Sequence, residues 1–178
     1  MKKMFNRIRL KSGFHKLRQE IKKLSRKNHS VSWSHAKNIG ILLIIHNQKE
    51  LVEAEKLALD FQNEDKKVKL LVYLADKTLA KPQIQNIEIL CDEDVEWNYI
   101  PKKEKILSFI NQEFDMLINL CTEICFPLIY ITALSKSLFK VGAYNSNQTA
   151  IFDFMIATEQ HSLSGFSSEL KHYLNKIK

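Results

Sequence analysis

Five polar residues follow apolar runs in this sequence and carry side chains that could bind or transform a small molecule: His46, Asn47, Asn119, Thr122 and Glu123. His46 is the best candidate for acid–base chemistry, because imidazole titrates near neutral pH. If the apolar runs are parallel strands, their carboxyl ends meet at one edge of a sheet, where open α/β folds bind ligands. Strand ends are also polar simply because they meet solvent. We therefore predict a possible cleft at this edge and assign no catalytic residue.

Two common site types are disfavoured by the residues themselves. The turn after the first apolar run has no glycine, which a dinucleotide-binding turn or a P-loop needs for close approach to phosphates, so we expect no nucleotide cofactor. Cys91, Cys121 and Cys125 lack the paired spacing of a zinc site, so we predict no metal and expect them to pack as small apolar residues. Asp153 lies inside an apolar run, where we expect a sheet edge, a cap or a partner lysine.

Charge is distributed unevenly along the 178 residues, whose formal sum is +7. Residues 1–37 hold 12 Lys and Arg against one acid, whereas residues 38–178 hold 15 basic and 19 acidic residues. Such a local field attracts a polyanion, and arginine adds bidentate phosphate contacts and stacking on bases. The predicted nucleic-acid-binding residues are Lys2, Lys3, Arg7, Arg9, Lys11, Lys16, Arg18, Lys22, Lys23, Arg26 and Lys27.

The leading functional hypothesis is a non-enzymatic, RNA-binding protein that is associated with a ribosomal particle through this segment. Deleting residues 1–27 is then expected to abolish co-sedimentation with RNA. Four alternatives stay open: a small-molecule or sugar-nucleotide site in the cleft, an anionic membrane surface, a protein partner, and packing of the basic segment on its own acidic domain. The sequence shows neither a secretory signal nor an apolar run long enough to span a membrane, so we expect a cytoplasmic protein.

A basic amphipathic helix must position these cations. Leu10, Phe14, Leu17, Ile21 and Leu24 recur at helical spacing and form one apolar seam among polar residues. The pair at positions 12–13, serine then glycine, interrupts the pattern and predicts a separate turn or arm before it. Residues 28–37 have no clear period and predict a linker in which the tryptophan is the anchor.

Apolar runs and helical periods alternate from residue 38 onward. The expected strands cover 40–45, 68–74, 84–91, 114–121, 138–144 and 151–157, and the expected helices cover 48–63, 104–111, 126–137 and 164–177. This order predicts an α/β fold, an open, mostly parallel sheet with helices on both faces, in a Rossmann-like three-layer sandwich preceded by the basic N-terminal helix. The expected domains are a basic arm with its linker over 1–37 and a single α/β domain over 38–178.

Three strings carry a resemblance: GILLII from Gly40, FDMLINLCTEICFPLIYITALSKSLFKVGAYN from Phe114, and FDFMIAT from Phe152. With the basic helix before them, they resemble an uncharacterised Bacteroidota family of small α/β proteins, a domain of unknown function, which brings no activity or site residues. The second string is also similar, more loosely, to the N-terminal half of heptosyltransferase-like glycosyltransferases, with Asn119 at the place of an aspartate. The chain is too short for their second half, so this likeness implies only the fold.

Overall fold

A parallel sheet forms the centre of the computed structural model, which describes residues 2–76, 78–79, 87–160 and 162–177. Its strand order is β3-β2-β1-β4-β5-β6, and every neighbouring pair is parallel. The described strands are β1 (Asn38–Ile45), β2 (Lys67–Leu74), β3 (Ile87–Leu90), β4 (Met116–Asn119), β5 (Phe139–Ala143) and β6 (Phe154–Ile156). The described helices are α1 (Lys2–Ile21), α2 (Gln48–Gln62), α3 (Lys103–Ile110), α4 (Phe126–Leu134) and α5 (Leu163–Leu174), with a 3₁₀ turn at Asp92–Asp94.

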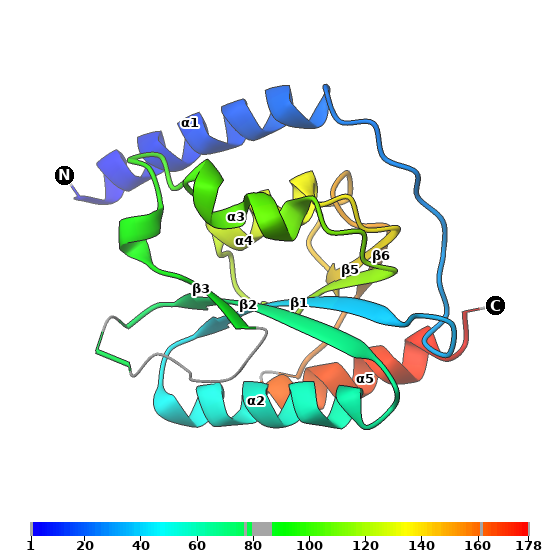
Figure 1. Cartoon of the computed structure of the whole chain (residues 1–178). Coiled ribbons are helices and arrows are strands. Elements are labelled where there is room, and N and C mark those ends of the chain that lie inside the picture. Colours follow the sequence, from blue (N-terminus) through cyan, green and yellow to red (C-terminus); the bar gives the residue numbers. More distant parts are fainter. Residues whose placement is uncertain (1, 77, 80–86, 161, 178) are drawn as a thin grey trace.

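Helices cover both faces of the sheet (Figure 1). α2 and α5 lie on one face, α3 and α4 lie on the other, and α1 lies outside the α3/α4 layer. The predicted α/β class, the parallel sheet, the three layers and the N-terminal helix are all confirmed. The strand order is that of a doubly wound sheet, and its direction of winding reverses between β1 and β4.

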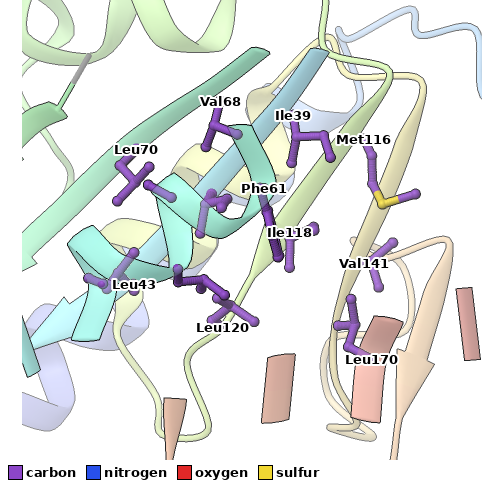
Figure 2. Packing of buried hydrophobic residues seen from close by; sticks show 14 of the residues in the cluster. Ile39, Leu43, Phe61, Val68, Leu70, Met116, Ile118, Leu120, Val141 and Leu170 are labelled. Atoms are coloured by element: carbon purple, nitrogen blue, oxygen red, sulfur yellow. The ribbon is translucent and has the colours of Figure 1, made fainter. Parts of the chain in front are cut away.

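Two apolar cores flank the sheet because its central strands are apolar on both faces. Alternate β1 residues such as Ile39 and Leu43 pack under α2 and α5, against Phe61 and Leu170 (Figure 2). Leu42, on the opposite side of β1, packs in the second core under α3 and α4. The expected strands 114–121 and 151–157 are too long, since pairing is confined to Met116–Asn119 and Phe154–Ile156; residues 84–86 of another lie outside the described residues.

The first helix runs without a break through Gly13, so the predicted interruption at this position is wrong. A Cβ atom at Gly13 would lie 2.5 Å from the carbonyl oxygen of Asn98 and 2.8 Å from two ring carbons of Phe126. Glycine is therefore required here because α1 approaches its own domain closely. Leu17 is almost fully buried in the same contact, and the ring of Phe14 meets that of Phe126 edge-on at 4.7 Å between centroids.

The segment between α1 and β1 is held against the domain by Trp33, as predicted. This indole is 4% exposed, packs edge-on against Phe61 and donates a 2.8 Å hydrogen bond from Nε1 to Glu64. The buried ammonium of Lys66 donates to the carbonyl oxygens of Trp33 and Ala36 at 2.8 and 3.0 Å. The linker is thus a packed strap that continues the hydrophobic core.

Candidate functional sites

Seven of the eleven predicted RNA-binding cations are exposed on α1 or in the six residues that follow it. Because the apolar seam turns toward α4, the basic residues between its members face solvent. None of the exposed ones forms an ion pair with a residue in the described part of the chain. They are Arg7, Lys11, Lys16 and Arg18 on α1 together with Lys22, Lys23 and Lys27 just after it, and we call this set the basic face of α1. Lys2 and Lys3 begin the helix, and the description of side chains starts after them.

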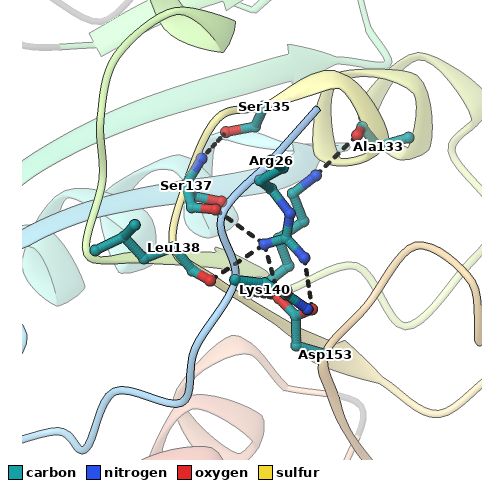
Figure 3. A network of polar contacts seen from close by, with 8 residues as sticks. Arg26, Ala133, Ser135, Ser137, Leu138, Lys140 and Asp153 are labelled. Carbon is teal, nitrogen blue, oxygen red and sulfur yellow. Dashed lines mark hydrogen bonds and ion pairs between the residues drawn. The ribbon is translucent and has the colours of Figure 1, made fainter. Parts of the chain in front are cut away.

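Arg26 is engaged within the protein and lies outside the basic face (Figure 3). Its guanidinium forms a two-pronged ion pair with the carboxylate of Asp153 at 2.9 and 2.5 Å, and both side chains are only about 15% exposed. The same guanidinium donates to the carbonyl oxygens of Ser137 and Leu138 at 2.9 and 3.2 Å. The sequence predicts a sheet edge, a cap or a partner lysine for Asp153, and the observed ion-pair partner is an arginine from the N-terminal segment.

Burial and neighbouring charges shift the pKa of Asp153 and that of the nearby Lys140. Burial raises the pKa of Asp153, but hydrogen bonds from Arg26 and from the amide of Lys140 outweigh it and hold the pKa below its ordinary value. Burial and the nearby Arg26 lower the pKa of the Lys140 ammonium to about 7. Lys140 donates a 2.8 Å hydrogen bond to the carbonyl oxygen of Ala133 at the end of α4. This network connects the segment after α1 to β5 and to the residue that directly precedes β6.

Arg9 is also held within the chain, at the N-terminal half of α1. Its guanidinium carbon lies 4.1 Å from the ring centroid of Tyr99 and 6.0 Å from that of Phe5. Its Nε donates a hydrogen bond to the carbonyl oxygen of Trp97. No sequence pattern revealed this cluster, because Arg9 and Trp97 are 88 positions apart.

A second site lies at the carboxyl ends of β1 and β4, where the sheet changes its direction of winding. It is a cleft of about 370 Å³, lined by four of the predicted residues, His46, Asn47, Thr122 and Glu123, together with residues of α2 and the start of α5. The Nε2 atom of His46 lies 2.5 Å from the Glu123 carboxylate, which supplies the acidic partner that the sequence did not reveal. Both side chains are about half exposed. A histidine–carboxylate pair at this position can bind a polar ligand or move a proton.

Two polar side chains near the cleft, those of Asn119 and Glu50, are already hydrogen-bonded within the chain. The amide of Asn119 is buried and donates to the hydroxyl of Thr132 at 3.0 Å, so this residue does not line the cleft. Glu50 accepts hydrogen bonds from the main-chain amide of His46 and from the side chain of Asn47, whose own oxygen caps α2. The main-chain amide of Glu50, one of the first-turn donors of α2 that a phosphate would use, is therefore already bonded to Asn47 at 3.1 Å.

Two of the three cysteine thiols are disfavoured as nucleophiles because burial opposes the formation of a thiolate. Burial raises the pKa of the Cys125 thiol to about 12 and that of Cys121 well above its usual range. Within the described residues, no group of three or more His, Cys, Asp or Glu side chains is arranged to hold a metal ion. In the same residues, no helix is both long and apolar enough to cross a membrane.

Fold and sites together define an α/β protein of Rossmann-like strand order that carries a basic helix on the outside of one helical layer and an open cleft at the switch point of its sheet. The chain belongs to a family of unknown function (DUF6913), which matches residues 9–177. This span takes in the basic helix from Arg9 onward together with the whole sheet. Neither a curated protein nor a solved structure shows a match to the chain.

Proposed function

We propose that this protein binds RNA through the basic face of α1, without enzymatic activity, in the cytoplasm and in association with a ribosomal particle. The observation that carries the proposal is the set of seven exposed Lys and Arg side chains on and just after a helix whose apolar seam is used up by its own domain. A rigid helix of 20 residues spans about 30 Å, enough to follow several phosphates of an RNA strand. Arg7 and Arg18 add planar guanidinium groups suited to phosphate.

The remaining residues of the chain do not add to the positive electrostatic potential of the N-terminal segment. Residues 38–178 carry four more acids than bases, so the positive potential belongs to the N-terminal segment. Glu20 is the one acid among the first 37 residues, and it is only partly exposed. A polyanion is therefore expected to approach along α1 and to be repelled elsewhere.

The structure decides how this proposal is best tested. Deleting residues 1–27 also removes Leu17 from the core, so loss of binding after that deletion could come from unfolding. A triple variant with Lys11, Lys16 and Lys23 changed to Gln leaves the apolar seam intact. If each lysine meets one phosphate of a single strand, the slope of log K against log salt falls by about 2.

The measurement is fluorescence anisotropy of a labelled 20-nucleotide RNA at several salt concentrations, with co-sedimentation on ribosomal particles beside it. A matched control changes Lys56, Lys67 and Lys176, which are exposed and lie outside α1, to Gln. We expect the control to bind like the wild-type protein. Equal binding by both triple variants would refute the assignment to α1.

The pair of His46 and Glu123 in the switch-point cleft favours a second candidate function, binding of a small polar molecule such as a sugar nucleotide. A degenerate transferase is the form of this candidate that we propose, and the likenesses to a Bacteroidota family and to the N-terminal half of heptosyltransferase-like glycosyltransferases add only the shared fold. We expect sugar phosphates or nucleotides to raise the melting temperature in the wild type and not in His46→Ala. His172→Ala, a change at an exposed histidine on α5, is the control.

A further inference from the structure

The loop between β3 and α3 contacts α1 at Arg9 and Gly13 and presents an exposed aromatic side chain. Residues Val95 and Pro101 form an isolated antiparallel bridge, and the amide of Glu96 donates to the carbonyl of Ile100 at 2.7 Å. Inside this bridge, the amide of Tyr99 donates to the carbonyl of Glu96 at 2.9 Å, which closes a tight turn. Trp97 is the second residue of that turn and is 58% exposed.

The turn is held in a conformation that its sequence alone would not favour. Tyr99 has a φ of 64°, in the left-handed region that costs a bulky residue free energy and persists only where its surroundings enforce it. Two contacts with α1 hold the turn in this conformation. Arg9 stacks on the Tyr99 ring and hydrogen-bonds the carbonyl of Trp97, and Gly13 admits the carbonyl of Asn98 against the helix.

A second exposed aromatic side chain, that of Phe5, lies on α1 four positions before Arg9. Phe5 is 60% exposed, and its ring centroid lies 6.0 Å from the guanidinium carbon of Arg9. The Phe5 ring and the main chain of Trp97 therefore both contact Arg9, and both aromatic side chains are exposed to solvent. Exposed aromatic groups beside cations form the stacking platforms on which unpaired bases bind.

We propose that Phe5 and Trp97 stack on unpaired bases, so that the RNA bound along α1 is single-stranded. This inference rests on the proposed function and adds the class of RNA to it. The bases of a duplex are already stacked on one another and would gain nothing from these rings. A single strand can place its phosphates along the basic face of α1 and turn two bases onto Phe5 and Trp97.

An anionic membrane is the competing partner for a basic helix with exposed apolar residues. The carboxylate of Glu96 is exposed and directly precedes Trp97 in the turn. Burying Trp97 in a headgroup region would bring this carboxylate to the anionic surface and strip it of water, which is unfavourable. A base that stacks on the indole leaves Glu96 in water, so the observations favour RNA.

The test compares a 12-nucleotide oligouridine strand with a 12-base-pair RNA duplex, using the full-length protein and anisotropy at fixed salt. We expect the wild type to prefer the single strand and to show quenching of Trp97 emission on binding. Trp33, the second tryptophan, is buried, so the change reports the exposed indole. Phe5→Ala and Trp97→Ala are each expected to weaken single-strand binding about tenfold with the salt slope unchanged. Tyr173→Ala, at an exposed aromatic residue on α5, is the control and is expected to bind like the wild type.

The outcomes separate this inference from the proposed function beneath it. If the wild type binds both RNAs equally and neither alanine variant differs from it, the stacking inference is wrong while RNA binding by α1 stands. If the wild type binds neither RNA, the proposed function fails and the inference fails with it. If the protein instead binds vesicles of phosphatidylglycerol and phosphatidylcholine, and Phe5→Ala and Trp97→Ala reduce that binding, the patch belongs to lipid and the inference is overturned.

Discussion

Replacing Gly13 with alanine tests the packing of α1 on its domain more directly than any other single change. In an exposed helix this substitution stabilises by about 1 kcal/mol, because alanine has the higher helix propensity. Here the added Cβ atom would meet a main-chain oxygen of Asn98 at 2.5 Å and the ring of Phe126 at 2.8 Å. Overpacking of this kind costs about 1–3 kcal/mol. The cost outweighs the propensity gain, and we expect Gly13→Ala to lower the free energy of unfolding by about 1 kcal/mol.

Gly165 in α5 provides a matched control for this prediction. Its added Cβ atom would meet the side-chain oxygens of Gln160 and Ser162 at 2.6 and 2.8 Å. The Gln160 side chain can rotate away, and the Ser162 hydroxyl, which accepts the cap hydrogen bond from the Gly165 amide at 3.1 Å, needs only a slight shift. We therefore expect Gly165→Ala to leave stability within about 0.5 kcal/mol of the wild type, or to raise it. Urea unfolding followed by tryptophan fluorescence measures both variants, with the slope m checked for constancy.

The decisive quantity is the difference in free energy of unfolding between Gly13→Ala and Gly165→Ala, with Gly13→Ala expected to be the less stable variant. If Gly13→Ala proves as stable as Gly165→Ala, α1 does not rest on Asn98 at the distance described here. In that case the strained turn at Tyr99 would lose one of its two supports. The cations of α1 and the aromatic side chain of Trp97 would then not be held in a fixed arrangement by the packing of α1.

Two further predictions concern the network around Asp153. Arg26→Ala leaves a largely buried carboxylate without its ion-pair partner and is expected to lower the free energy of unfolding by about 3 kcal/mol at pH 7. Arg18→Ala, at an exposed position of α1, is the control and is expected to leave stability nearly unchanged. Urea unfolding measures both variants. The pKa of Asp153 is lowered in the folded state, so its ionised carboxylate stabilises the fold above its unfolded pKa. This stabilisation is lost as the pH falls through the folded pKa. The free energies of unfolding of the two variants are therefore expected to converge in acid. For Lys140, burial lowers the folded pKa to about 7 while the unfolded chain binds a proton up to about pH 10, so stability is expected to rise by about 1 kcal/mol per pH unit between pH 7 and 8.5. Lys140→Met is expected to remove that rise, and an unchanged pH dependence in this variant would contradict the assignment.

Patterns of local sequence were sufficient to predict most of the fold. The alternation of apolar runs and helical periods predicts the order of strands and helices, and the run from Gly40 to Ile45 predicts a strand that is buried on both faces. The apolar seam of α1 was also visible, because its members recur at a spacing set by the helix alone. These features depend on neighbours within a few positions, where periodicity is informative.

Features that depend on distant residues could not be predicted in the same way. Gly13 resembles a helix breaker in sequence, and only the position of Asn98 shows that it permits a close approach. The partner of Asp153 lies 127 positions away, and the partner of His46 lies 77 positions away. The residues around Trp97 have no period at all, so their role emerges only where α1 covers them.

The ion pair between Arg26 and Asp153 has a consequence for the biosynthesis of the chain. A ribosome elongates at about 5–20 residues per second, so the guanidinium exists for roughly 6–25 seconds before its carboxylate partner is polymerised. During that interval the apolar seam of α1 also lacks α4, because Phe126 follows Ile21 by about a hundred residues. The nascent N-terminal segment is thus an uncovered amphipathic peptide for much of its synthesis, and a chaperone that shields it would protect the protein from aggregation until the last strand emerges.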